Sequence, residues 1–315
     1  MDVTTHPDLI LSSQRISTLA TTLHNRQTAI RTPATMEDDD IEDLANEDKI
    51  TGYVHSIDSF TAVDGAGIRC IFFLQSCHKR CVFCCNVDST DAALARADAS
   101  TPTPLGRRMR VRECVDIVRR NLDYYKASGG GVTLSGGECL LQPEFARAVC
   151  RGVRALGVSA SIDTAGAGTD KEWNRVLPHV DCVLLCLKSA FVDRYVAITG
   201  TSVEEFELSR RFLRACEAHG TPTWLRFVLM TNPQNDERFA AYATDSEEEL
   251  VELARVAKSH ACVLGIELLP YHRLGVFKFQ ELELDYALEG MATPTGEDIE
   301  RAKSILTSQG VRVMC

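Results

Sequence analysis

Three cysteines on one short segment, Cys77, Cys81 and Cys84, have the spacing of a metal-binding loop. Three and then two residues separate them, so their sulfur atoms can converge on one metal centre. A tetrahedral zinc site and a fully ligated four-iron cluster each need four protein ligands, so three cysteines leave one position open to a small molecule. From this loop alone, a structural zinc site and thiols that only pack are the alternatives.

The next residue, Cys85, offers a fourth thiol. Adjacent residues usually direct their side chains differently, so we expect Cys84 to be a ligand and Cys85 not to be one. Residues 68–74, directly before the loop, are rich in β-branched and aromatic residues and predict a buried strand. The cysteine loop is therefore expected where a strand ends.

Further polar or small residues follow the other predicted strands, where parallel α/β barrels gather their functional groups. Two glycines let a ligand approach the backbone closely, and lysine or arginine suits a carboxylate or ribose hydroxyls. Histidine suits the edge of an adenine or a ribose. Each signal is weak by itself, whereas their joint placement on one edge of a sheet indicates a ligand site. These residues are Gly136, Gly137, Glu138, Asp163, Lys188, Arg226 and His272.

The segments that must position these groups alternate between strand and helix. Apolar runs predict strands at 68–74, 132–134, 158–162, 182–187, 223–230, 264–269 and 311–314. Helical spacing predicts helices at 111–125, 145–153, 203–218, 246–259 and 297–308. Strand–helix alternation sustained six times predicts a partial (βα)6 parallel barrel, with a doubly wound open sheet as the alternative.

Composition narrows the class of protein. The chain has 315 residues, of which 45% are apolar and 25% charged, so it can bury a sizeable core. It contains no run of eighteen apolar residues, and we expect no membrane partner. The thirteen cysteines are odd in number and some, such as Cys182 and Cys186, lie in apolar strand-like runs. We therefore expect a soluble intracellular protein with metal-ligating and buried free thiols, in a reducing compartment of the cytoplasm or an organelle.

Charge is concentrated before the predicted fold. The net charge is −10, of which residues 36–49 carry −7 and residues 1–35 carry +1, leaving −4 for residues 50–315. Nothing in this balance indicates a nucleic-acid partner. We predict that residues 1–49 are a disordered extension with an acidic linker, and that residues 50–315 are the catalytic domain. The Ser/Thr-rich stretch with arginines at 9–35 is typical of an organellar transit peptide or of a disordered tail.

From about residue 52 to its end, the chain resembles the pyruvate formate-lyase activating enzymes, a family of radical S-adenosylmethionine enzymes. This resemblance covers more than four-fifths of the chain. The matching segments are 63–69 (VDGAGIR), the cysteine loop, 128–138 (SGGGVTLSGGE), 187–188 (LK), 224–228 (WLRFV) and 266–275 (IELLPYHRLG).

The resemblance implies a radical reaction on a protein substrate. Cys77, Cys81 and Cys84 would hold a [4Fe–4S] cluster whose open iron binds S-adenosylmethionine. One electron then cleaves the cofactor to methionine and a 5′-deoxyadenosyl radical, which abstracts hydrogen from a backbone glycine of pyruvate formate-lyase. A flavodoxin- or ferredoxin-like protein would donate the electron, and a monovalent cation would assist cofactor binding. The resemblance thus implies an oxidoreductase that takes part in anaerobic glucose metabolism.

The resemblance also assigns residues. Gly137 would meet the methionine moiety, Lys188 the ribose, Arg226 the carboxylate and His272 the nucleoside end. The full cofactor-binding set is Phe83, Cys85, Gly136, Gly137, Glu138, Asp163, Cys186, Leu187, Lys188, Arg226 and His272. The substrate-binding set is Asp64, Gly65 and Arg69.

Four positions depart from the family pattern. Ala66 stands for a proline, Cys85 for a histidine, Ala165 for an asparagine and Cys186 for an aspartate. The change at Cys186 affects the expected cation site. Together the departures keep a non-catalytic metal-clip protein as an alternative.

Activation of another glycyl radical enzyme is the other alternative. Many such activators carry a cysteine-rich insert after the first loop. Cys114 is the only cysteine in residues 86–130, so this chain has no such insert. This favours pyruvate formate-lyase as the substrate.

Overall fold

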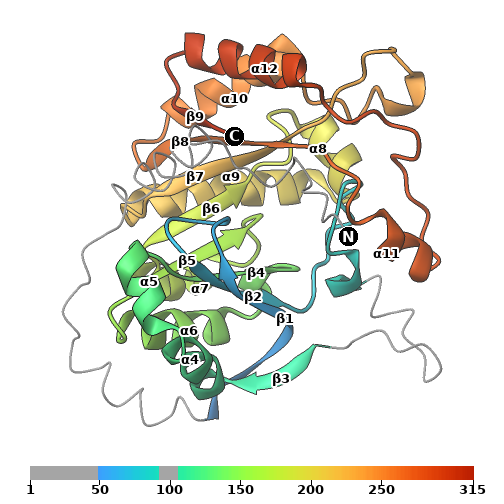
Figure 1. The fold of residues 1–315 in the computed structure, drawn as a ribbon. Helices are drawn as coiled ribbons and strands as arrows, with labels where there is room; N and C mark the ends of the chain where they lie inside the picture. The colour runs from blue at the N-terminus through green and yellow to red at the C-terminus, as the bar shows by residue number, and fades with distance from the viewer. Residues whose placement is uncertain (1–48, 92–105) are drawn as a thin grey trace, which may run out of the picture.

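One curved sheet organises the protein, and the computed structural model describes residues 49–91 and 106–315 of it (Figure 1). The strand order is β3-β1-β2-β4-β5-β6-β7-β8-β9. From β2 to β9 the strands run parallel in this order, whereas β1 is antiparallel to both β2 and β3. Within the described residues β3 and β9 each pair on one side only, so the sheet does not close into a full barrel.

The strands are β1 (Thr51–Thr61), β2 (Arg69–Leu74), β3 (Arg107–Arg110), β4 (Gly131–Gly136), β5 (Ser159–Thr164), β6 (Cys182–Cys186), β7 (Thr223–Leu229), β8 (Val263–Pro270) and β9 (Val313–Met314). The helices are α4 (Val111–Arg119), α5 (Leu122–Ser128), α6 (Pro143–Arg154), α7 (Asp170–Val176), α8 (Val192–Thr199), α9 (Val203–Ala218), α10 (Glu247–Lys258), α11 (Val276–Glu281) and α12 (Gly296–Ser308).

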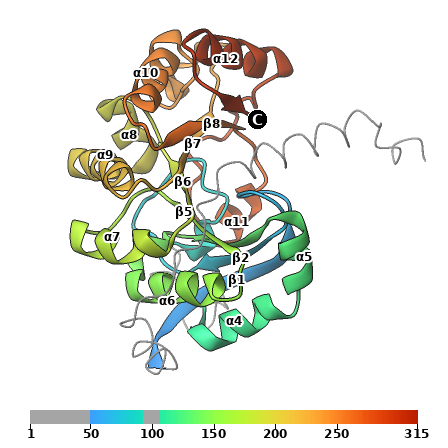
Figure 2. The same ribbon diagram turned by 90° about the vertical axis from the view of Figure 1, so that its left-hand side faces the viewer.

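The predicted partial (βα)6 barrel is confirmed. Helices α6, α7, α9, α10 and α12 follow one another along the same outer side of the sheet (Figure 2). A doubly wound sheet would instead place helices on both faces. The core lies between this outer row of helices and the strands, and its largest buried side chains include Trp173, Phe72 and Phe212.

Some helices and strands differ from those predicted from the sequence. The helix predicted at 111–125 is two helices, α4 and α5, because Asn121 has φ −119° and ψ 20°, outside the helical region. Asparagine competes with the helix for backbone hydrogen bonds, although the apolar spacing continues past it. Strands β1 and β3 and helices α7, α8 and α11 were not predicted. The expectation for residues 1–49 falls on positions that, apart from Lys49, lie outside the described residues.

The triple glycine before β4 lets that strand approach its neighbours. Gly129 has φ 66° and ends α5 in the left-handed conformation. A Cβ on Gly130 would lie 1.9 Å from the carbonyl oxygen of Ile68, and one on Gly131 would lie 2.0 Å from that of Ser159. Larger residues would therefore push β4 away from β2 and β5.

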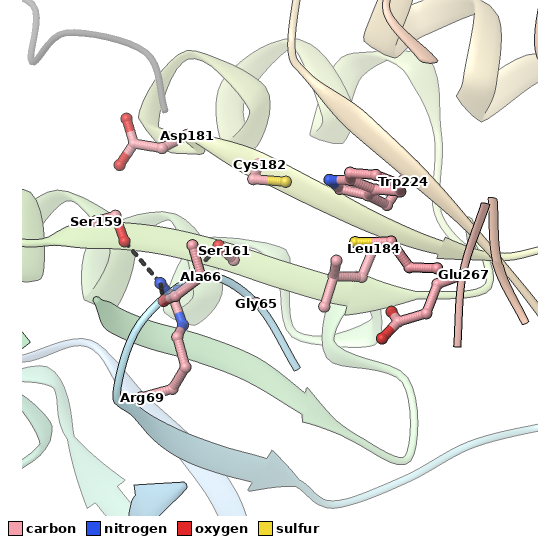
Figure 3. A pocket seen from close by; sticks show the side chains of 11 residues that line it. Gly65, Ala66, Arg69, Ser159, Ser161, Asp181, Cys182, Leu184, Trp224 and Glu267 are labelled. Atoms are coloured by element: carbon pink, nitrogen blue, oxygen red, sulfur yellow. Dashed lines mark hydrogen bonds between the residues drawn. The ribbon is translucent and has the colours of Figure 1, made fainter. Parts of the chain in front are cut away.

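Arg69 fills the inside of the barrel at the N-terminal ends of the strands (Figure 3). Its side chain donates hydrogen bonds to the hydroxyls of Thr133 (2.9 Å), Ser159 (2.6 Å) and Ser161 (2.9 Å), and the residue is 1% exposed. A cavity of about 20 Å³ remains beside it, room for about one water molecule. Arg69 therefore ties the strands together at the barrel base, and its predicted contact with a substrate stays a prediction.

No helix among the described residues has the length and apolar character needed to cross a membrane.

Candidate active site

A cavity of about 540 Å³ opens at the C-terminal ends of the parallel strands. This volume is in the range of cofactor and drug-sized ligand sites. Most of the predicted site residues line it, although they come from segments far apart in the sequence. These are Asp64, Cys77, Cys81, Phe83, Cys84, Cys85, Gly136, Gly137, Glu138, Asp163, Cys186, Lys188, Arg226 and His272.

Three predicted residues do not line this cavity. Arg69 and Gly65 border the small cavity at the barrel base instead. Leu187 is buried in the core, and its backbone N–H donates to the carbonyl of Arg226. Of the predicted substrate residues, only Asp64 reaches the active-site cavity.

The cysteine loop is held by its backbone. The N–H of Arg80 donates to the carbonyl of Thr199 (2.7 Å) and that of Val82 to Ile198 (2.9 Å), which fastens the loop to the end of α8. Within the loop, the N–H of Cys84 donates to the carbonyl of Cys81 (3.0 Å). A rigid loop presents its thiols with little loss of conformational entropy when a metal centre binds.

The chemistry of the loop fits an iron–sulfur cluster. Cys77, Cys81 and Cys84 are half-buried around one cavity, whereas Cys85 is exposed. Burial raises the pKa of the Cys77 thiol to about 12, and the ammonium of Lys188 acts in the opposite direction. Metal ligands must be deprotonated, so nearby ammonium groups favour the ligating form. Lys79 and Lys188 both line the cavity and can offset the negative charge of three thiolates.

Lys188 reaches into the cavity between a thiol and an aromatic ring. Its Nζ lies 2.9 Å from Sγ of Cys186 and 5.2 Å from the centre of the Phe83 ring. Burial would lower the pKa of Lys188, but Cys186, Cys81 and Asp163 together raise it well above its usual value. The side chain is therefore a fixed cation on the cavity wall.

Arg226 is surrounded by three carboxylates. Its Nη2 lies 2.7 Å from Oδ1 of Asp64, its Nη1 lies 3.1 Å from Oδ2 of Asp163, and its Nε lies 3.1 Å from Oε2 of Glu267. Burial raises the pKa of Asp163, Arg226 opposes this rise, and Asp64 adds to it. The guanidinium thus joins the β1–β2 loop to β5 and β8.

Glu138 fixes the backbone around the cavity. Its carboxylate accepts hydrogen bonds from the N–H of Leu140 (3.1 Å), the hydroxyl of Thr164 (2.5 Å) and the N–H of Ala165 (2.8 Å). A Cβ on the preceding Gly137 would lie 2.1 Å from the carbonyl oxygen of Ser76. The Gly-Gly-Glu sequence therefore packs the end of β4 against the start of the cysteine loop and ties it to the end of β5.

The chain is similar in sequence to a known family and to curated proteins. The sequence model of a family described as a 4Fe-4S single cluster domain matches residues 63–213. The pyruvate formate-lyase-activating enzyme of Clostridium pasteurianum is 36% identical over 257 residues, which are 82% of this chain and 98% of that protein. This chain belongs to the pyruvate formate-lyase-activating enzyme family. The Staphylococcus epidermidis member is 32% identical over 267 residues, 83% of this chain and 97% of that protein.

The fold also agrees with a solved structure. A radical SAM methyltransferase from Sphaerobacter thermophilus matches with a TM-score of 0.51 over 95% of this chain and 91% of that one. Its sequence identity is 15%, so the likeness concerns the fold alone.

Sequence analysis of this activating-enzyme family member missed some residues in and around the active-site cavity. Ser135 lines the cavity beside the predicted Gly136, and its position at the end of β4 was the available signal. Thr164, which sequence analysis placed with Asp163 at the end of a strand, also lines the cavity. Lys79 lies inside the cysteine loop, where a lysine between two ligands was a signal that we did not use. Glu267 had no signal, because only the pairing of β7 with β8 places it beside Arg226.

Proposed function

We propose that this chain activates pyruvate formate-lyase by generating a glycyl radical on it. Relatives that carry the name of the activating enzyme support this function, since they align over more than four-fifths of the chain. The observation that carries it is the cavity in which three loop cysteines meet the ends of the parallel strands.

In this proposal Cys77, Cys81 and Cys84 hold a [4Fe–4S] cluster, and S-adenosylmethionine occupies the cavity beside it. When bound, the two groups supply reductive cleavage of the sulfonium and the hydrogen abstraction from glycine. The wall residues bind and orient the cofactor, while Asp64 meets the glycine-bearing segment. The proposed cofactor contacts are Phe83, Cys85, Gly136, Gly137, Glu138, Asp163, Cys186, Lys188, Arg226 and His272.

The remaining roles extend this proposal. Lys188 binds the ribose and His272 the nucleoside end. Residues 50–315 form the catalytic domain, and residues 1–49 lie outside it. A flavodoxin- or ferredoxin-like protein supplies the electron. A monovalent cation binds near Cys186, through backbone carbonyl oxygens that the change from aspartate to cysteine leaves in place.

The decisive experiment uses anaerobically reconstituted protein. We expect about four irons and four sulfides per chain, release of 5′-deoxyadenosine from S-adenosylmethionine after reduction, and a glycyl radical signal in added pyruvate formate-lyase. The variant Cys81→Ala is expected to lose all three. A protein that binds one zinc and cleaves no cofactor would establish the metal-clip alternative. Cofactor cleavage without a radical on pyruvate formate-lyase would indicate another glycyl radical enzyme.

A further inference from the structure

Lys79 is a buried cation inside the cysteine loop. It lies between Cys77 and Cys81 in the sequence and is only 2% exposed. It lines the active-site cavity and also a second cavity of about 160 Å³, which reaches Cys81 and Cys84 as well. The proposed cofactor contacts do not include it.

An ion pair holds this lysine in place. Its Nζ donates to Oε2 of Glu205, which also lies 2.9 Å from Nε2 of His78. The Lys79 ammonium lies 5.9 Å from the centre of the Tyr195 ring. The Tyr195 hydroxyl in turn donates to the backbone carbonyl of Glu205 (3.2 Å).

The two charged side chains of this ion pair differ in their exposure to solvent. The Lys79 side chain is 1% exposed, whereas that of Glu205 is 24% exposed and begins in the first turn of α9. Lys79 lines the cavity that holds the cysteines, whereas Glu205 is not among the residues that line it. Solvent screens the outer charge more than the inner one.

Lys79 shares one cavity with the cysteines. Cys77, Cys81 and Cys84 line the active-site cavity together with Lys79, which lies between the first two of them in the sequence. A buried lysine is unfavourable unless it is paired, so its place among ligands suggests a use.

We propose that Lys79 sets the reduction potential of the cluster, and that Glu205 limits its effect. This rests on the proposed role of Cys77, Cys81 and Cys84 as cluster ligands. Reduction adds one negative charge to the cluster, and a nearby buried cation stabilises the reduced form. Net charge and hydrogen bonds to sulfur are the main means by which a protein tunes such a potential.

The test is the midpoint potential of the reconstituted protein, followed by electron paramagnetic resonance at one fixed pH. Lys79→Met is expected to shift the potential downward. Glu205→Gln is expected to shift it upward, because the lysine charge then lacks its partner. The double variant, with both Lys79→Met and Glu205→Gln, is expected to have a midpoint potential closer to that of the wild type than Lys79→Met alone. Each single shift is about tenfold in the ratio of oxidised to reduced cluster, which is about 59 mV for one electron.

Arg80→Met is the matched control. Arg80 is the next residue and carries the same charge, but it is exposed, so its removal is expected to leave the potential unchanged. Lys79→Arg keeps the charge and is expected to keep the wild-type potential. Iron and sulfide are measured for every variant, so each comparison is made at equal cluster content.

The outcomes separate the two proposals. A wild-type protein that assembles no cluster overturns the proposed function. A cluster whose potential is the same in all variants, or moves in one direction in both single variants, overturns only the role of Lys79. If Lys79→Met does not retain its cluster, the other two variants test the proposal. A midpoint potential that does not rise in Glu205→Gln refutes it, and so does a potential that falls in Lys79→Arg.

Discussion

Replacing Arg226 by methionine should leave three carboxylates facing one another inside the protein. Asp64, Asp163 and Glu267 lie 2.7–3.1 Å from the guanidinium, and Arg226 is 9% exposed. Removing one partner of a buried charge pair destabilises a protein by about 3–5 kcal/mol. For a chain of this size we therefore expect Tm to fall by roughly 10 °C near neutral pH.

The loss should depend on pH. The folded-state pKa of Asp163 is already raised above its ordinary value, and loss of Arg226 should raise it further. A carboxyl whose pKa is higher in the folded than in the unfolded protein favours folding at low pH. That contribution disappears as pH rises through the folded pKa. The deficit in Tm should therefore be smaller at about pH 5 than at about pH 8.

Thermal melts followed by far-ultraviolet circular dichroism measure this deficit in the metal-free chain. Adding Asp163→Asn to Arg226→Met removes one repelling charge and is expected to recover about 1–3 kcal/mol. Arg255→Met is the control, because Arg255 pairs with Glu252 at the surface and its loss should cost about 0–1 kcal/mol at any pH. A deficit that is equal at both pH values, or a double variant no more stable than Arg226→Met, would refute the reasoning.

Four further results are expected. Cys84→Ala should lose its cluster iron while Cys85→Ala keeps it, since Cys85 is exposed; the opposite pattern would exchange their roles. A chain beginning near Lys49 should cleave S-adenosylmethionine at the full-length rate, and a large drop would place the extension in the site. Cys186→Asp should tighten cofactor binding or make it respond to potassium or sodium, because carboxylate oxygen suits such ions better than sulfur; identical responses in a potassium series would contradict this. Gly137→Ala should retain little iron, because its Cβ would lie 2.1 Å from a carbonyl of the cysteine loop; normal iron content would show that the loop can shift.

Sequence reasoning found the parallel strands because a strand buried on both faces is continuously apolar. Strand β1 escaped detection because only Gly52 and Val54 are buried in it and the rest of its residues are half-buried or exposed, with polar side chains such as His55 and Asp58 along it. Helix α7 is short, and Trp173 and Val176 are its only apolar residues. Helix α8 has Val192, Tyr195 and Val196 at helical spacing, but it is only 8 residues long. The apolar strands and the long helices were therefore predictable from pattern, whereas β1, β3 and the short helices α7, α8 and α11 were not.

The site was predictable where its residues follow strands in the sequence, as Asp163, Lys188 and the Gly-Gly-Glu segment do. The place of the Arg69 side chain was not predictable, because Arg69 adjoins the Asp64 loop in the sequence, whereas β2 begins at Arg69 and its side chain points into the barrel base. The neighbours of Arg226 depend on strand register, which pairs it with Cys186 on one side and Glu267 on the other. Such contacts across strands cannot be obtained from one sequence by spacing.

The backbone contacts of the cysteine loop have a consequence for how the protein matures in the cell. The loop is synthesised early, but its anchors Thr199 and Ile198 lie far later in the chain. Gly275, whose added Cβ would lie 2.6 Å from Cα of Cys85, comes later still. While the ribosome is making the first half of the chain, the thiols have no fixed arrangement to offer. We therefore expect the thiols to reach this arrangement only after the segment with Gly275 has been synthesised and has folded, so that a cluster would be inserted late in the maturation of the chain.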